Sequence, residues 1–191
     1  TTMFNEKLEG EIRTGTARAY GAELMVQKAS GSFTGWVSYT YCRSRRQIDG
    51  INNNREYAAP YEKPHNISVV MNYEITKRIT AGANWVYSTG APVSLPTGRW
   101  EFGNYTLPVY SEKNGYRLPA YHRLDLSVSL KCKEKPGRKC FGEWNLSVFN
   151  VYNRKNAYTI FFNKDYNTQK MQSYKLSFFG IVPSISYNFR F

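Results

Sequence analysis

The carboxy-terminal stretch Ser184-Ile185-Ser186-Tyr187-Asn188-Phe189-Arg190-Phe191 alternates large apolar residues with small or polar ones and stops on an aromatic residue. Successive side chains of a β-strand point to opposite faces, so the odd-numbered residues share one face and the even-numbered residues the other. A wall between lipid and a wet lumen requires this alternation. The stretch therefore predicts the last strand of a transmembrane β-barrel.

The composition agrees with a barrel and excludes a helical membrane protein. Mean hydropathy is −0.57, and no run of about 18 apolar residues occurs among the 191 residues. The 16 Tyr, 11 Phe and 4 Trp residues suit the aromatic girdles of a barrel. They would equally suit a carbohydrate-binding β-sandwich, which stays open as an alternative binding module.

A formal charge of +12 raises the question of a nucleic-acid partner. The basic residues lie in expected connections, around 43–55 and 131–139, where acidic residues are interspersed. The sequence contains no basic helix, no aromatic RNA-binding motif and no zinc-finger spacing, so we expect no nucleic-acid partner. Outer-membrane lipid headgroups and lipopolysaccharide phosphates are the simpler partners for this charge.

Three cysteines leave the redox state open. Cys132 and Cys140 flank a lysine-rich turn and could meet across a hairpin, although two free thiols fit equally well. Cys42 has no obvious mate. Because no pair has the short spacing of a zinc knuckle, we expect neither a metal nor a cofactor.

Period-two alternation predicts seven long antiparallel strands joined by short and long connections in strict alternation. The expected strands are about 16–28, 33–42, 66–75, 79–88, 124–131, a sixth from about 143, and a last one that reaches 191 with a bulge or break near Pro183. Outer-membrane barrels have long external loops and short periplasmic turns. Counting back from the carboxy-terminus places the loops at 43–64, 89–121 and 153–173 outside.

Seven strands do not close a bacterial single-chain barrel, which has an even number. An open edge facing lipid would leave unpaired amides. Residues Thr1 to Gly15 contain neither an initiator methionine nor a signal peptide. We therefore expect residues 1–191 to be the carboxy-terminal part of one barrel domain, without its earlier strands.

Several motifs, in this order and spacing, resemble the carboxy-terminal third of a TonB-dependent outer-membrane receptor of the Bacteroidetes type. They are Ala19-Tyr20-Gly21-Ala22-Glu23-Leu24, Ser38-Tyr39-Thr40-Tyr41, Pro64-His65, the segment from Leu118 to Leu126, Phe149-Asn150-Val151-Tyr152-Asn153 and the terminal Tyr187 to Phe191. The resemblance implies an up-and-down barrel of 22 strands and an amino-terminal plug, and we expect the plug, like the earlier strands, to lie outside residues 1–191. It also implies nutrient import driven through TonB.

Candidate site residues follow from the expected loops and faces. External loops on a rigid wall carry recognition, so ligand contacts are expected from Arg45, Arg46, Tyr57, Tyr61, Trp100, Phe102, Tyr105, Tyr110, Asn114, Tyr116 and Arg117. Lumen or plug contacts are expected from Glu23, Glu74, Arg123, Asp125 and Arg190. Tyr187, Phe189 and Phe191 are expected, from the resemblance, to signal to the barrel-assembly machinery. A surface lipoprotein is a further possible partner.

Two histidines offer little for catalysis. His65 and His122 each precede an expected strand, and His122 lies three residues before Asp125, which mimics half of a hydrolase triad. No nucleophile motif accompanies them, so we expect structural roles at the bases of the loops and no enzymatic activity. A small outer-membrane barrel enzyme remains the formal rival.

Overall fold

The computed structural model describes residues 12–103, 105–110, 112–133, 141–164 and 171–190. The chain divides into two compact units. The wall unit comprises residues 22–41, 64–90 and 118–191, and the loop unit comprises residues 1–21, 42–63 and 91–117. Among the described residues, no helix has the length and apolar character needed to cross a membrane.

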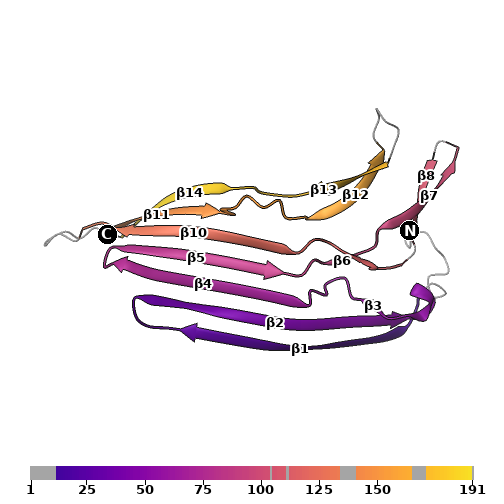
Figure 1. Cartoon of the computed structure of the whole chain (residues 1–191), viewed down its shortest axis with the longest axis horizontal. Helices are drawn as coiled ribbons and strands as arrows, with labels where there is room; N and C mark the ends of the chain where they lie inside the picture. Colours follow the sequence, from indigo (N-terminus) through magenta and orange to yellow (C-terminus); the bar gives the residue numbers. More distant parts are fainter. Residues whose placement is uncertain (1–11, 104, 111, 134–140, 165–170, 191) are drawn as a thin grey trace. The chain divides into compact units, whose positions relative to one another are not determined.

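Seven long strands lie side by side in one sheet (Figure 1). In sheet order they are β1 (Gly15–Lys28), β2 (Phe33–Ile48), β4 (His65–Thr76), β5 (Ile79–Ser88), β10 (Tyr121–Lys131), β11 (Phe141–Phe149) and β14 (Val182–Arg190). From β2 to β14 every neighbouring pair is antiparallel. Within the described residues the sheet is open, with β1 and β14 at its edges. The expected all-β antiparallel architecture is confirmed.

The register aligns apolar and polar residues in separate rows across six strands. One row consists of Phe33, Tyr73, Ala81, Val128, Leu146 and Ile185. The next row consists of Thr34, Asn72, Gly82, Ser127, Ser147 and Ser184. Since adjacent rows point to opposite faces, the sheet has one apolar and one polar face, as the alternation predicts.

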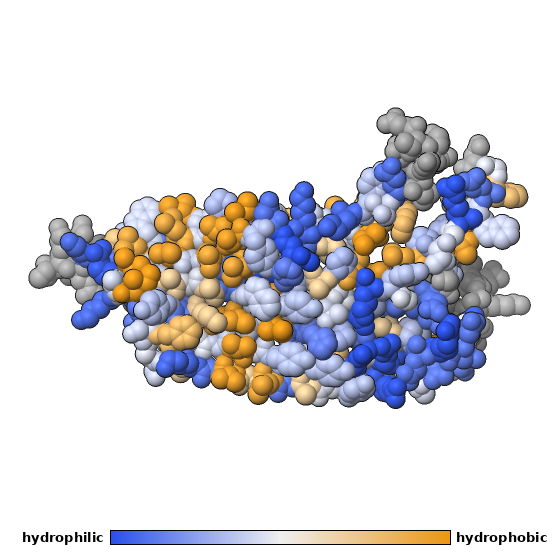
Figure 2. Space-filling view, in the orientation of Figure 1, coloured by the Kyte–Doolittle hydropathy of each residue, from blue (hydrophilic) through white to orange (hydrophobic). Residues whose placement is uncertain are grey.

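The apolar face is exposed to its surroundings. Phe33, Tyr73, Val128, Leu146 and Ile185 are between 41% and 65% exposed. Figure 2 shows apolar side chains gathered over the strands of the wall unit. A soluble sheet would cover such a face with a second layer, because each exposed apolar side chain forgoes burial energy. In the described residues of the wall unit, this face is instead a continuous apolar surface.

Aromatic side chains lie near both ends of this face. At one end the ring of Trp144 lies 4.7 Å from that of Tyr187, measured between centroids. At the other end the Trp85 and Tyr87 rings are stacked, with centroids 6.2 Å apart. Tyrosine and tryptophan combine an apolar ring with a polar group, which suits the boundary between hydrocarbon and water.

The expected long loops contain additional short elements. After β2 come the 3₁₀ turn Asn52–Asn54 and β3 (Tyr57–Ala58); after β5 come β6 (Pro92–Val93), β7 (Pro96–Phe102), β8 (Tyr105–Tyr110) and β9 (Tyr116–Arg117); after β11 come β12 (Thr159–Lys164) and β13 (Met171–Leu176). The pairs are β2 with β3, β6 with β9, β7 with β8, and β12 with β13. The predicted loops are thus largely small hairpins.

Two predicted boundaries are wrong. Strand β2 continues past Cys42 to Ile48, so Arg45 and Arg46 lie in a strand and not in a loop, because β3 pairs with them. The last strand is also shorter than predicted, since residues 177–181 interrupt it and β13 pairs with β12. Pro183 itself lies in β14, opposite Val148. The break precedes it, where Phe179 adopts a φ of 50°.

Whether Cys132 and Cys140 form a disulfide across a hairpin or are two free thiols stays open, as in the sequence analysis. Cys132 is half-buried, and Cys140 lies outside the described residues. Cys42 is also half-buried and is a free thiol.

Candidate functional site

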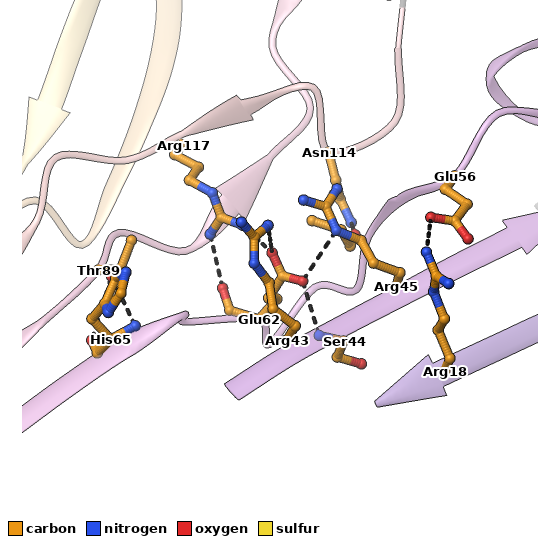
Figure 3. Close-up of polar contacts among 11 residues, drawn as sticks. Arg18, Arg43, Ser44, Arg45, Glu56, Glu62, His65, Thr89, Asn114 and Arg117 are labelled. Carbon is orange, nitrogen blue, oxygen red and sulfur yellow. Dashed lines mark hydrogen bonds and ion pairs between the residues drawn. The ribbon is translucent and has the colours of Figure 1, made fainter. Parts of the chain in front are cut away.

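A buried glutamate organises the centre of the loop unit (Figure 3). Strand β3 pairs with the end of β2, and the chain then turns back so that the Glu62 amide donates to the Ala59 carbonyl over 3.0 Å. This turn brings the Glu62 carboxylate against β2, where Oε2 accepts a hydrogen bond of 2.9 Å from the Ser44 amide. The carboxylate thereby extends the backbone pairing between the two segments.

Three arginines converge on this carboxylate. Arg43 and Arg45 lie two residues apart in β2, so their side chains share a face. Their nitrogens lie 4.0 Å and 3.4 Å, respectively, from the Glu62 oxygens. Arg117, in β9, forms an ion pair with Oε1 and also donates to the Glu62 carbonyl oxygen over 3.0 Å. We refer to Arg43, Arg45, Glu62 and Arg117 as the arginine cluster.

The acidic side chain of the arginine cluster is buried, whereas the three basic side chains are partly exposed. The Glu62 side chain is 0% exposed, whereas the side chains of Arg43, Arg45 and Arg117 are 34%, 30% and 31% exposed. A buried carboxylate needs ionic and hydrogen-bonded partners to offset its lost hydration. The cluster supplies both, and it leaves the cationic side chains in contact with solvent.

Polar contacts attach residues 112–117 to the segment 52–63. Asn114 donates to the Ala58 carbonyl over 2.8 Å. The Asn52 side chain forms two hydrogen bonds with the Lys113 backbone, of 2.9 Å and 2.7 Å. Asn52 and Asn114 both have positive φ, which asparagine tolerates better than most residues. Side-chain-to-backbone bonds between segments distant in sequence therefore connect these two parts of the loop unit.

The structure brings together three of the sequence-predicted ligand residues and buries one other. Arg45, Asn114 and Arg117 meet around Ala58 and Glu62. Tyr57 is only 4% exposed, and the Lys113 Nζ lies 5.9 Å from its ring centroid. Their assignment as ligand contacts stays a prediction, and the observed contacts of Arg45, Asn114 and Tyr57 are those of structural residues.

Most of the remaining ligand candidates are exposed, and the side chain of Tyr105 is not described. Arg46 lies in β2, opposite Tyr57 of β3, and is exposed. Five aromatic candidates are between 46% and 87% exposed, namely Tyr61, Trp100, Phe102, Tyr110 and Tyr116. The hairpin of β7 and β8 pairs Trp100 with Leu107 and Phe102 with Tyr105. Trp100 and Phe102 are 72% and 78% exposed, so this hairpin presents apolar rings to the outside.

Sequence reasoning missed the roles of Glu62 and Arg43. The available signal was the spacing of Arg43 and Arg45, which places two cations on one strand face. No sequence pattern indicated that a carboxylate 17 and 19 residues later would lie against them. That proximity depends on β3, which is only two residues long.

On the polar face of the wall unit, Arg123 and Asp125 form a second network. Arg123 donates to Asp125 Oδ2 over 3.0 Å, and its guanidinium carbon lies 4.0 Å from the Phe149 ring centroid. Asp125 Oδ1 accepts from the Asn150 amide over 2.9 Å. Glu23 and Glu74 are exposed. Lumen contact stays a prediction for all four residues and for Arg190, whose side chain is not described.

The two histidines bond to tyrosines. His65 Nδ1 lies 2.9 Å from the Tyr39 hydroxyl, and His122 Nδ1 lies 2.8 Å from the Tyr152 hydroxyl. Asp125 lies on the other face of β10 from His122, so the sequence proximity that mimics a triad brings no shared hydrogen bond. Within the described residues, no group of three or more His, Cys, Asp or Glu side chains could hold a metal ion.

A family model matches most of the chain. The model described as "TonB dependent receptor-like, beta-barrel" matches residues 10–153. The chain belongs to the TonB-dependent receptors. Membership identifies an outer-membrane receptor or transporter, implies interaction with TonB, and is not that of an enzyme family. Searches of the curated proteins and of the solved structures found no significant match.

Hydrogen bonds hold two motifs of this TonB-dependent receptor in place at one end of the sheet of the wall unit. Asn150, which is 1% exposed and has a φ of 54°, donates to the Arg154 and Phe179 carbonyls over 3.0 Å and 3.3 Å. Asn156 donates to the His122 carbonyl and accepts from the His122 amide. The segments around His122 and Asn150 thus connect β10 and β11 with the segment that precedes β14.

Proposed function

We propose that this chain supplies seven adjacent wall strands and the external loops of an outer-membrane barrel that imports a nutrient in a TonB-dependent manner. The main support is the alignment of residues across six strands: one row of residues is apolar and exposed, and the next row is polar. Lipid solvates the first face and water in a lumen the second. The nutrient class, whether metal chelate, glycan or peptide, stays open in this proposal.

The dimensions of the apolar face support a membrane wall. In β4 the outward residues run from Ile67 to Ile75. At about 3.4 Å per residue and a strand tilt of about 40°, this segment rises about 21 Å across the membrane. The apolar band of an outer-membrane barrel is about 25 Å tall. The outward apolar residues of β4 therefore cover most of this band, and the whole strand, from His65 to Thr76, is long enough to cross it.

In this proposal the exposed aromatic residues of the loop unit contact the nutrient. Tyr61, Trp100, Phe102, Tyr110 and Tyr116 are accessible, and rings of this kind stack on sugars, peptides or chelates. Their position on loops held by β-hairpins combines accessibility with defined geometry.

We also propose that the polar face of the wall contacts an amino-terminal plug, through which TonB acts. Arg123 and Asp125 are held rigidly by Phe149 and Asn150, and they offer charged groups on that face. The open edges at β1 and β14 support pairing with further strands of the same barrel domain, since lipid does not tolerate unpaired edges. A total of 22 strands and a Bacteroidetes origin remain predictions.

The terminal strand is proposed to bind the barrel-assembly machinery. Tyr187 and Phe189 lie on the apolar face, and Tyr187 contacts Trp144; Phe191 lies outside the described residues. Membrane lipid and lipopolysaccharide contact the same face in this proposal. The proposed partners of the external loops include a surface lipoprotein.

Fluorescence quenching by lipids with brominated acyl chains tests the membrane wall in the full receptor. Trp85 and Trp144 lie on the apolar face, Trp36 lies on the opposite face, and Trp100 lies in the loop unit. Replacing Trp85 or Trp144 by phenylalanine should remove quenched emission, whereas replacing Trp36 should not. Equal loss from Trp36 and Trp85 would contradict the assigned faces, as would a receptor that stays monodisperse without detergent.

A further inference from the structure

A shallow apolar groove crosses the exposed face of the wall unit near one end of the sheet. It has a volume of about 430 Å³, and β5, β10, β11 and β14 supply its lining residues: Ile79, Val128, Leu130, Trp144, Leu146 and Ile185. Five of these side chains are aliphatic, and the sixth is an indole. Four neighbouring strands span about 14 Å, at about 4.8 Å from strand to strand. The groove can therefore hold part of one hydrocarbon chain.

Basic residues lie directly beyond this groove. Arg78 immediately precedes Ile79 in the chain. Lys131 immediately follows Leu130, which is opposite Ile79 in the register. The Arg78 Nε donates to the Lys131 carbonyl over 2.9 Å, so the guanidinium bridges the ends of β5 and β10. Lys77, in the same turn as Arg78, is exposed, and so is Lys131. Figure 1 shows the turn between β4 and β5 and the ends of β10 and β14 at one end of the sheet.

Basic residues outnumber acidic ones in the two stretches that adjoin the groove at this end. Residues 74–78 and 131–143 together contain seven Lys or Arg residues and three Asp or Glu residues. Among the described residues, no ion pair joins Lys77, Arg78 or Lys131 to an acidic side chain. An anion that approaches these three groups therefore displaces no carboxylate of the described part of the chain.

We propose that this end of the wall binds an anionic glycerophospholipid, with one acyl chain in the groove and the phosphate beside Arg78 and Lys131. Guanidinium groups bind phosphate through planar N–H donors, and each basic residue near an anionic membrane surface strengthens binding about fivefold. The Trp144 ring in the groove lies 4.7 Å from the Tyr187 ring, and such amphipathic rings suit the level of the headgroups.

The same observations select the leaflet. Short turns face the periplasm in the proposed barrel, and Arg78 lies in the short turn between β4 and β5. The lipid is therefore a phospholipid of the periplasmic leaflet, on the side opposite the external loops. This inference deepens the proposed function and rests on it, because it requires lipid against the apolar face.

Brominated phospholipids that differ only in their headgroups test this site in the full receptor. Trp144 lines the groove, whereas Trp85 lies on the same face six register positions away, about 20 Å along the strands. Brominated phosphatidylglycerol should quench Trp144 at a mole fraction at least fivefold lower than brominated phosphatidylethanolamine. The two lipids should quench Trp85 equally. The emission of each tryptophan follows from the difference between the receptor and its Trp→Phe variant.

Charge variants test the phosphate contact. Replacing both basic residues, Arg78→Gln with Lys131→Gln, should abolish the preference of Trp144 for phosphatidylglycerol. Lys28→Gln is the matched control, because it removes a charge at the end of β1, where another short turn follows. This control should leave the preference within twofold. Unchanged quenching of Trp85 verifies that each variant is inserted in the membrane.

A second pair of variants tests the acyl chain. Val128→Phe fills the groove and should raise the mole fraction of phosphatidylglycerol needed at Trp144 at least twofold. Val69→Phe makes the same change on the apolar face outside the groove, opposite Val37 and Trp85 in the register, and should have no such effect.

The outcomes separate the site from its alternatives. Equal quenching of Trp144 by the two phospholipids would overturn it, as would the same loss of preference in Lys28→Gln. Relief of the quenching at Trp144 by added lipopolysaccharide would assign the groove to the other leaflet and would also overturn the proposal. The membrane wall is decided separately, since quenching of Trp85 and Trp144 by either phospholipid supports the wall even without a headgroup preference.

Discussion

Replacement of Glu62 by glutamine should destabilise the loop unit strongly, because the variant keeps the size of the side chain and removes its charge. The wild-type carboxylate is 0% exposed, forms ion pairs with three arginines and accepts the Ser44 amide hydrogen bond of 2.9 Å. Removing one partner of a buried ion pair costs about 3–5 kcal/mol. Since the arginine side chains are about one-third exposed and regain water, we expect the lower end, about 3 kcal/mol.

Hydrogen exchange of the Ser44 amide measures this loss directly. The amide donates to Glu62, so its protection reports the free energy of opening at this place. Because about 1.4 kcal/mol corresponds to tenfold, the Glu62→Gln receptor should exchange Ser44 about a hundredfold faster. Mass spectrometry on peptides that contain residues 43–46, taken from the full receptor in detergent, gives the required resolution.

Glu112→Gln provides the control for this experiment. Glu112 is also paired with an arginine, Arg55, but both side chains are well exposed. Such surface pairs contribute about 0.2–1 kcal/mol, so the control should change exchange at Ser44 by less than about fivefold. If the Ser44 amide exchanged no faster in the Glu62→Gln receptor than in the Glu112→Gln receptor, the arginine cluster would not be what holds the turn at Glu62 against β2.

Three further predictions concern the wall unit. Leu146→Lys, on the exposed apolar face, should destabilise the membrane-inserted receptor by about 2–4 kcal/mol in urea unfolding from lipid vesicles, while Ser147→Lys on the polar face should cost much less. Gly90→Ala should increase proteolysis at the loop base, because a Cβ at this position would overlap the Leu118 carbonyl oxygen; unchanged cleavage would refute this contact. Asn150→Ala should lower the thermal midpoint more than any exposed asparagine substitution, since it removes the bonds of a buried side chain to two backbone carbonyls and one backbone amide, each worth about 1 kcal/mol.

The long strands of the wall unit could be predicted because each one is specified by the order of its own residues. Alternation with period two specifies which residues share a face, and one face must match lipid along the entire strand. The strand that runs from Ile79 to Ser88 was therefore predicted at its observed bounds. The register between strands follows from the same requirement, because a slip by one residue would place polar residues such as Ser147 on the lipid side.

The elements of the loops could not be predicted in the same way. Strand β3 has two residues and pairs through Arg45 and Arg46, so its pattern is too short to carry a periodic signal. Tyr57 looked like a ligand-binding aromatic from its position in an expected loop, yet it is buried there. Whether the side chain of a loop residue is buried depends on which distant segment packs against it. The composition of the loop does not indicate which segment that is.

By itself, the sequence determined the strands, their two faces and the side of the membrane on which each connection is expected, because lipid and water impose an alternation on every strand separately. The tertiary structure alone decided which charges meet. Glu62 and Arg117 are 55 positions apart, and only the folding of two loops onto each other buries the carboxylate while the arginines stay exposed. Charged residues that are distant in sequence meet because the two loops pack against each other, and the alternation within a strand gives no information about that packing.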